Sequence, residues 1–246
     1  MNDLELAGII ADKTGKILLD LRASGLFTGK ALGRAGDRVA NAFIIAALQE
    51  NRPDDAVLSE EERDDPSRLQ ARRVWIVDPL DGTREYGEGR ADWAVHIALA
   101  VDGFPVVGAV ALPGLGRVML SQPQSLPAMA AKPRVVVSRT RPVPEALAVA
   151  EALGAELVPM GSAGAKAMAV LRGEAEIYLH TGGQYEWDNC APAAVALAAG
   201  LHVSRIDGTP LVYNNETPYL PDLLICQTPY AAQVLTALNS NPERDI

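Results

Sequence analysis

The sequence is poor in cysteine and in positive charge, and it contains no long apolar run. Cysteine occurs only at Cys190 and Cys226, which provides neither a disulfide framework nor the ligand spacing of a zinc site. This scarcity is typical of the reducing cytoplasm, where we expect the protein to be located. Asp and Glu outnumber Lys and Arg by 31 to 22, giving a net charge of −9. This charge argues against a nucleic-acid partner, because duplex binding depends on neutralising phosphates.

Other absences concern membranes and histidine ligands. No uncharged apolar run approaches the roughly 18 residues of a membrane span, and MNDLELAGII lacks the basic start and apolar core of a signal peptide. We therefore expect no membrane partner. The three histidines, His96, His180 and His202, are isolated along the chain, and none has metal-ligand spacing. Within WAVHIAL, His96 is interpreted as a core residue.

The residues that are present predict an α+β first half. The 246 residues are 48% hydrophobic, enough for one large domain or two small ones. Apolar residues at helical spacing predict helices over residues 3–22 and 37–51, separated by a Gly-rich loop, LFTGKALGRAGD. Strands are predicted in DAVLSEE and RRVWIVDPL. Three apolar runs from Trp93 to Leu120, separated by turn signals, then predict an antiparallel meander.

The second half alternates between strand and helix patterns, which favours an α/β lobe. Strands are predicted in RVVVS, AELVPM, EAEIYL and DLLICQTP, and helices in VPEALAVAEALG, SAGAKAMAVLRG, DNCAPAAVALAAG and YAAQVLTAL. The proline-rich stretch QPQSLPAMAAKP is the expected boundary. We therefore predict an N-terminal α+β lobe over residues 1–130 and a C-terminal α/β lobe over residues 131–246. No internal repeat is visible.

The stretch VWIVDPLDGTREY ends a predicted buried strand with two acids. Asp78 and Asp81 stand three residues apart in a turn, where their carboxylates can converge on a cation such as Mg²⁺, which takes oxygen ligands. Gly82 allows close backbone approach. Thr83 supplies a hydroxyl where a helical turn begins, a favourable place for phosphate. Taken alone, the same residues also suit an ordinary Asx turn.

Two further groups of acids occur at predicted element ends. Glu60 and Glu61 follow the predicted strand VLS, and Asp188 in EWDNCAP begins an Ala-rich helix. Considered singly, the glutamates also suit a solvated charge run, and Asp188 also suits an N-cap.

Taken together and in this order, SEE, WIVDPLDGT and EWD followed by AP resemble the inositol monophosphatase superfamily. The resemblance continues through GSAGAKAMAVLRGEAEIYLH and YLPDLLIC. VLSEE, DPLDGTREY and VVVSRTR are most similar to the CysQ-type 3′(2′),5′-bisphosphate nucleotidases, which dephosphorylate 3′-phosphoadenosine 5′-phosphate (PAP). The resemblance implies an α/β fold with a layered αβαβα sandwich. It also implies a phosphomonoesterase that acts on PAP or its sulfated relative PAPS in sulfur assimilation and is inhibited by lithium.

Two alternatives stay open. The first alternative keeps the superfamily but changes the substrate, to inositol 1-phosphate or fructose 1,6-bisphosphate. The second alternative is a different class of protein: a non-catalytic protein that binds a nucleotide or a metal.

The resemblance also implies a site for two to three Mg²⁺ ions. Glu60, Asp78 and the carbonyl of Leu80 would hold one ion, and Asp78, Asp81 and Asp188 a second. A third, weaker ion would lie beside Glu60. Two-metal catalysis activates the attacking water, neutralises the phosphoryl oxygens and stabilises the leaving oxygen.

Thr83 and Asp37 are the residues expected to serve the catalytic water, together with the metal-binding acids. In the family, the Thr of the D-G-T motif helps to orient this water. Many relatives also carry S-P-V-T-x-A-D before the second helix, and its Thr and Asp serve the same water. Here the stretch is KALGRAGD: Asp37 keeps the acid, Arg34 replaces the Thr, and the role of that Thr has no assigned residue.

Substrate binding is expected from residues on both halves of the chain. By resemblance they are Gly82, Thr83, Ser138, Arg139, Arg141, Gly161, Ser162, Lys166 and Glu186. In the family's S-R-S-H segment, Thr140 here replaces the second Ser and Arg141 the His; Arg141 still suits a phosphate or ribose. From the sequence alone, Lys166 also fits a solvated helix position. A homodimer is a further expectation, because relatives are often dimers.

Overall fold

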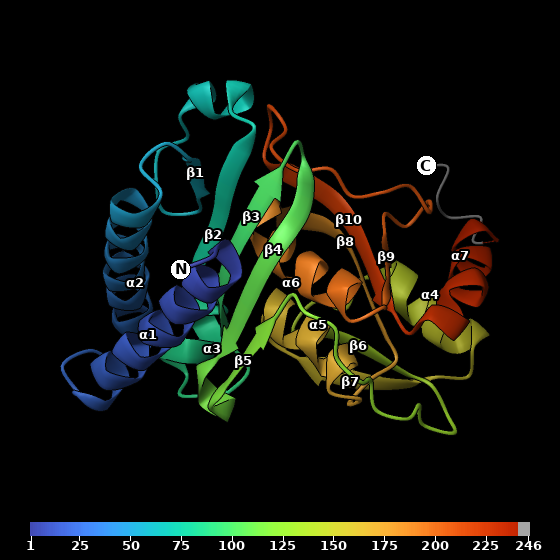
Figure 1. Cartoon of the computed structure of the whole chain (residues 1–246). Coiled ribbons are helices and arrows are strands. Elements are labelled where there is room, and N and C mark those ends of the chain that lie inside the picture. The colour runs from blue at the N-terminus through green and yellow to red at the C-terminus, as the bar shows by residue number, and fades with distance from the viewer. Residues whose placement is uncertain (241–246) are drawn as a thin grey trace.

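Two five-stranded sheets and three layers of helices make up residues 1–240, which a computed structural model describes (Figure 1). The last six residues of the expected second lobe, 241–246, lie outside this described part. The helices are α1 Asp3–Ala23, α2 Gly29–Asn51, α3 Thr83–Gly87, α4 Pro144–Ala152, α5 Ala163–Leu171, α6 Glu186–Ala198 and α7 Ala231–Asn239, with 3₁₀ segments η1 Pro66–Gln70, η2 Pro113–Leu115 and η3 Thr228–Tyr230. The strands are β1 Ala56–Ser59, β2 Arg73–Asp81, β3 Ala94–Val101, β4 Phe104–Leu112, β5 Arg117–Leu120, β6 Arg134–Ser138, β7 Glu156–Met160, β8 Ile177–Tyr185, β9 His202–Ser204 and β10 Tyr219–Cys226.

The strands of each sheet follow a simple order. In the first sheet the order is β1-β2-β3-β4-β5, with β1 parallel to β2 and the remaining pairs antiparallel, which confirms the predicted meander. In the second sheet the order is β7-β6-β8-β10-β9. Here β6 runs parallel to β7 and β8, and β10 runs antiparallel to β8 and β9.

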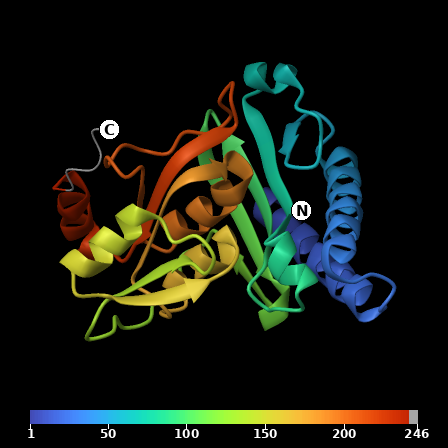
Figure 2. The same cartoon turned by 180° about the vertical axis from the view of Figure 1, so that it is seen from behind.

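The helices complete an αβαβα sandwich, as expected. Helices α1 and α2 cover the outer face of the first sheet, α5 and α6 lie between the sheets, and α4 and α7 cover the outer face of the second (Figures 1 and 2). The chain passes from the first sheet to the second between Leu120 and Arg134. The division into lobes 1–130 and 131–246 stays a prediction. No helix within residues 1–240 has the length and hydropathy that a membrane crossing needs.

Helix α6 is central because it is apolar on nearly every side. Cys190, Ala191 and Val195 are fully buried and belong to a core cluster that also contains residues of both sheets. Gly108 on β4 allows close packing, since a Cβ there would lie 2.6 Å from the carbonyl oxygen of Ala191. This packing holds the first turn of α6, with Asp188, beside the first sheet.

The predicted loop over residues 26–37 is wrong beyond Thr28, because α2 begins at Gly29 and not at Asp37. Gly29 has a left-handed φ of 52° at the start of α2, whereas Gly33 and Gly36 allow close contacts. A Cβ at Gly33 would lie 2.5 Å from Cγ2 of Thr83, and one at Gly36 would lie 2.9 Å from Cδ2 of Leu80. The early start of α2 therefore places Asp37 against the turn that follows β2.

Candidate active site

Three carboxylates converge where β2 ends and α6 begins. Asp78, Asp81 and Asp188 each offer an oxygen, and these oxygens all lie within 4.8 Å of one another. The pairing of β2 with β3 is irregular between Asp78 and Asp81, a bulge of the kind that redirects side chains. Asp188 lies in the first turn of α6, and its Oδ2 accepts a 2.6 Å hydrogen bond from the backbone N–H of Tyr185.

Glu60 joins this cluster from the neighbouring strand. Because β1 pairs in parallel with β2, Ser59 lies opposite Val77, and the backbone N–H of Glu60 donates to the Val77 carbonyl at 3.3 Å. The carboxyl groups of Glu60 and Asp78 are close neighbours. The structure thus brings Asp78, Asp81 and Asp188 together and places Glu60 next to Asp78.

The electrostatics of the cluster favour a bound cation. Burial and the neighbouring Asp81 raise the pKa of Asp188 to about 7. Much of Glu60 is exposed to solvent. Its carboxyl group, however, is partly enclosed by protein, and this burial together with the nearby Asp188 raises the pKa of Glu60 to about 7. Burial and Glu60 raise the pKa of Asp78 well above its ordinary value. A divalent cation stabilises the ionised acids, and carboxylate oxygens are the ligands that Mg²⁺ prefers. The donor set therefore fits a divalent metal.

Asp81 differs from its neighbours because it is held by the start of α5. Its carboxylate accepts hydrogen bonds from the Ser162 hydroxyl, from the Ala163 N–H at 3.1 Å and from the Gly164 N–H at 2.6 Å. Burial raises the pKa of Asp81, but contact with His96 and Ser162 outweighs burial and lowers it to about 2. Asp81 therefore stays ionised and fastens β2 to α5, in the favourable field of a helix N-terminus.

His96 is the main site contact that the sequence reasoning missed. It is fully buried, as expected of a core residue, but its Nε2 lies 3.2 Å from Oδ2 of Asp81. Its Nδ1 lies 3.0 Å from the carbonyl oxygen of Trp187. The ring thus links the end of β2 to the turn that carries Asp188. Only the register of β3, which places His96 opposite Asp78, could have revealed this.

Thr83 and Asp37 meet at the edge of the acid cluster. The Thr83 hydroxyl lies 3.3 Å from Oδ1 of Asp37 and 3.1 Å from the carbonyl oxygen of Leu80. Gly82 precedes Thr83 with φ of 89°, a left-handed conformation that favours glycine. Burial, together with the charge of Glu61, raises the pKa of Asp37 to about 6. Asp37 is therefore suited to exchange a proton near neutral pH.

A cavity of about 260 Å³ opens beside the D-G-T turn, and we call it the substrate cavity. It is lined by residues of both halves of the chain. They include eight of the nine expected substrate residues: Gly82, Thr83, Ser138, Arg139, Arg141, Gly161, Ser162 and Lys166.

Two of the cations in this lining are already engaged by the protein. Lys166 is buried, donates to the Ser162 carbonyl at 2.6 Å, and has a pKa lowered by burial. The alternative of a solvated Lys166 is therefore wrong. Arg139 pairs with Glu85 at 2.7 Å and with Glu88 at 2.6 Å.

Glu186 is the expected substrate residue that does not line this cavity. It is fully buried and accepts hydrogen bonds from the backbone N–H groups of Asn214 and Asn215, at 2.7 and 2.8 Å. Residues two apart on a helix do not share a face, so Glu186 points away from the side chain of Asp188. This placement corrects the expected substrate contact: Glu186 anchors a loop.

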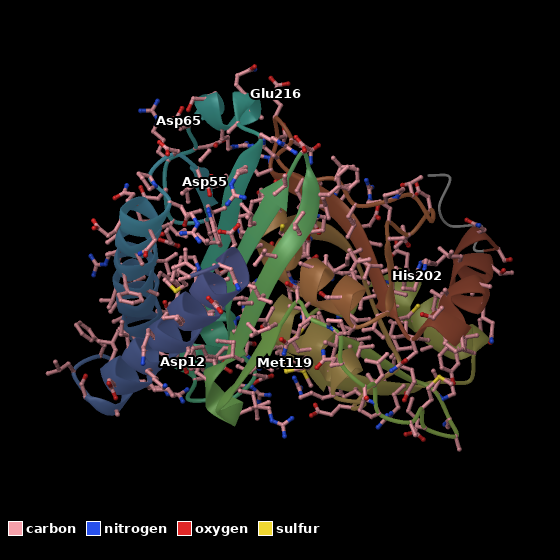
Figure 3. All side chains as sticks on the ribbon, viewed as in Figure 1. Asp12, Asp55, Asp65, Met119, His202 and Glu216 are labelled. Carbon is pink, nitrogen blue, oxygen red and sulfur yellow. The ribbon has the colours of Figure 1, made fainter. Side chains whose placement is uncertain are left out.

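The anchored loop is also bound by Arg68 of η1. The guanidinium of Arg68 is buried and donates to Oδ1 of Asn214 and to the carbonyl oxygen of Asn215, at 2.7 and 2.9 Å. Figure 3 labels Asp65, next to η1, and Glu216, in this loop, at the same end of the molecule. The segment that follows Glu60 is thereby tied to the start of α6.

Comparison with known proteins identifies the family. Residues 28–156 and 134–241 match the family model described as the inositol monophosphatase family. The chain belongs to this family. The resemblance drawn from the sequence is therefore confirmed, and enzymes of the inositol monophosphatase family are metal-dependent.

Relatives within the family agree over most of the chain. It is 49% identical over 251 residues to the 3′-phosphoadenosine 5′-phosphate phosphatase of Mycobacterium leprae, covering 96% of this chain and 93% of that protein. It is 34% identical over 203 residues to the 3′(2′),5′-bisphosphate nucleotidase CysQ of Escherichia coli K12, covering 76% and 81%.

Solved structures of the family share the fold. CysQ from Bacteroides thetaiotaomicron aligns with a TM-score of 0.78 and 26% identity, over 92% of this chain and 97% of that one. An inositol monophosphatase from Staphylococcus aureus aligns with a TM-score of 0.81 over 98% and 96%, at 19% identity. At this low identity the second likeness shows the fold alone.

Proposed function

We propose that the chain is a magnesium-dependent phosphomonoesterase that removes the 3′-phosphate of PAP, and of PAPS by the same chemistry. The observation that carries this proposal is the convergence of Asp78, Asp81 and Asp188, with Glu60 next to them, beside a cavity whose lining includes lysine and arginine. The printed names of the M. leprae and E. coli relatives support the choice of substrate.

In this proposal the chain's own residues divide the work. The carboxylates of Glu60, Asp78, Asp81 and Asp188, with the carbonyl of Leu80, would hold two to three Mg²⁺ ions. Bound Mg²⁺ supplies neutralisation of phosphoryl oxygens and a lowered pKa for the attacking water.

Thr83 and Asp37 serve that water. The Thr83 hydroxyl, in contact with Asp37, positions the water, and Asp37 takes up its proton; the raised pKa of Asp37, about 6, suits this exchange. On the substrate side, Ser138, Arg139, Arg141 and Lys166 line the space for the sugar and the base. A cytoplasmic location, a role in sulfur assimilation, a homodimer and the lack of a nucleic-acid partner stay predictions.

A substrate comparison tests the proposal. Phosphate release is measured from PAP, inositol 1-phosphate and fructose 1,6-bisphosphate with Mg²⁺, and again after chelation. We expect kcat/KM for PAP to exceed the other two by about tenfold or more, or roughly 1.4 kcal/mol of transition-state preference. A higher value for inositol 1-phosphate would make the substrate assignment wrong. No release from any substrate with Mg²⁺ would favour a non-catalytic binding protein.

A further inference from the structure

A second cavity, of about 460 Å³, adjoins the candidate active site on the side of α2. It shares Thr83 and Arg84 with the substrate cavity, and the mechanism above gives it no role. We call it the basic pocket. Its lining residues come from α2 and from α3 with its C-cap: Gly29, Lys30, Arg34, Thr83, Arg84, Gly87 and Glu88.

The charged side chains around the basic pocket are mainly positive, and Lys30, Arg34 and Arg84 are exposed to solvent. Arg34 also lines a neighbouring cavity that contains Asp37 and Glu61. Within residues 1–240, the side chains of Lys30, Arg34 and Arg84 form no ion pair or hydrogen bond with any carboxylate. Glu88 is an acid of the lining, and Arg139 already binds it at 2.6 Å. Because all three cations are exposed, water screens their mutual repulsion, and an anion can reach them from solution.

The backbone adds to this field. Lys30 and Arg34 are four residues apart on α2, so their side chains leave the same face of the helix. Gly29 is the first residue of this 23-residue helix, and Thr28 at the N-cap makes no side-chain capping bond. The positive end of the α2 dipole therefore lies at the pocket without a capping oxygen.

Close packing of α3 on the start of α2 forms the wall between them. A Cβ at Gly87 would lie 2.7 Å from the carbonyl oxygen of Gly29, so only glycine permits this approach. Because the two helices lie this close, Arg84 of α3 lines the same cavity as Lys30 and Arg34 of α2. Guanidinium groups bind tetrahedral oxyanions through two parallel N–H bonds, and lysine adds a point charge.

We propose that the basic pocket binds a tetrahedral oxyanion, a phosphate or a sulfate, next to the phosphate that is hydrolysed at Thr83. Two sources offer this chemistry: the second acidic group of a bisphosphorylated substrate, or a free inorganic anion. The first source rests on the proposed function, whereas the second does not. Lys30, Arg34 and Arg84 are then residues that determine specificity, in addition to those expected from the sequence.

The experiment compares Arg84→Gln and the double variant Lys30→Gln/Arg34→Gln with wild type. Lys13→Gln, which removes one charge from the exposed side of α1, is the matched control. With Mg²⁺ present, KM is measured for PAP and for 3′-AMP, which lacks the second phosphate. In parallel, the rise in Tm caused by sodium sulfate is measured in each protein, which needs no turnover.

If the substrate is the source, both variants raise KM for PAP roughly tenfold, the loss expected for one charge-assisted contact, and leave KM for 3′-AMP within about twofold. If a free anion is the source, the PAP to 3′-AMP ratio stays at the wild-type value and the sulfate-induced rise in Tm shrinks in both variants. Either result supports the site, provided that Lys13→Gln behaves as wild type. An unchanged ratio together with an unchanged or absent sulfate effect overturns it. Failure of wild type to hydrolyse either nucleotide counts against the proposed function alone, and the sulfate measurement still decides the pocket.

Discussion

Asp188 should weaken the metal-free fold at neutral pH, although the proposed chemistry requires it. In the folded chain its pKa is raised from 3.8 to about 7, so the fold favours the protonated acid. The unfavourable contribution is absent below about pH 4, grows as the pH rises, and is complete above about pH 7. A pKa difference of this size corresponds to at most roughly 4 kcal/mol, shared with the other acids of the cluster.

The measurement is urea unfolding of wild type and Asp188→Asn in EDTA, at pH 4.5 and pH 7.5. An Asn oxygen can still accept the bond from the Tyr185 N–H, so the cap of α6 is kept. We expect the variant to be more stable than wild type at pH 7.5 by roughly 2–4 kcal/mol, and at pH 4.5 by only about 1 kcal/mol or less. Saturating Mg²⁺ should reverse the order, because a ligand that binds only the folded state stabilises it.

Taking the difference in unfolding free energy between wild type and Asp188→Asn removes the contributions of other titrating groups. Burial lowers the pKa of His180 to about 4, so protonation of the unfolded chain favours unfolding as the pH falls below about 6.5. This contribution has the opposite sign, but it is the same in both proteins and cancels in their difference. A wild type as stable as Asp188→Asn in EDTA at pH 7.5, or a difference independent of pH, would refute the reasoning.

Three further variants test the packing around the site. Asp81→Asn should abolish phosphate release and lower the free energy of unfolding by about 2 kcal/mol or more, because its amide faces the donors at the start of α5; wild-type stability would contradict this. Gly33→Ala should lower kcat about tenfold or more, since the new methyl displaces Thr83, while Gly8→Ala on α1 should leave kcat unchanged. Arg68→Ala should cost about 2 kcal/mol of stability by freeing the loop at Asn214, and should raise the Mg²⁺ concentration needed for half-maximal activity; an unchanged Mg²⁺ requirement would show that the tie to α6 is not needed.

The regular elements could be predicted because their hydrophobic periods are clear. One exception is the short strand β9, His202–Ser204, which was not predicted. Other exceptions occur where glycine has another use. Residues 29–36 of α2 were assigned to a loop because Gly33 and Gly36 suggested a turn, whereas both glycines lie at close contacts. Strand β8 was predicted to end near Leu179 but continues through Gly182 and Gly183, which have positive φ and follow no strand pattern.

The parts of the candidate site that could be predicted are those encoded by residues close together in the sequence. The D-P-L-D-G-T turn is contiguous, and its order relative to Glu60 and Asp188 suggested which acids meet. The contact of His96 with Asp81 depends on strand register, and the basic pocket depends on how α3 packs on α2. Neither depends on sequence spacing, so no reading of the chain alone could place them. Their contributions to catalysis stay predictions.

The hydrogen bonds between Asp81 and the start of α5 have a consequence for biosynthesis. A nascent chain that has left the ribosome only as far as β5 carries Asp81 without Ser162 and Gly164, and Asp78 without Asp188. Its acids then face one another with neither amide donors nor a complete set of ligands. We therefore expect a divalent cation to be captured late in maturation, once the two sheets have closed around α6.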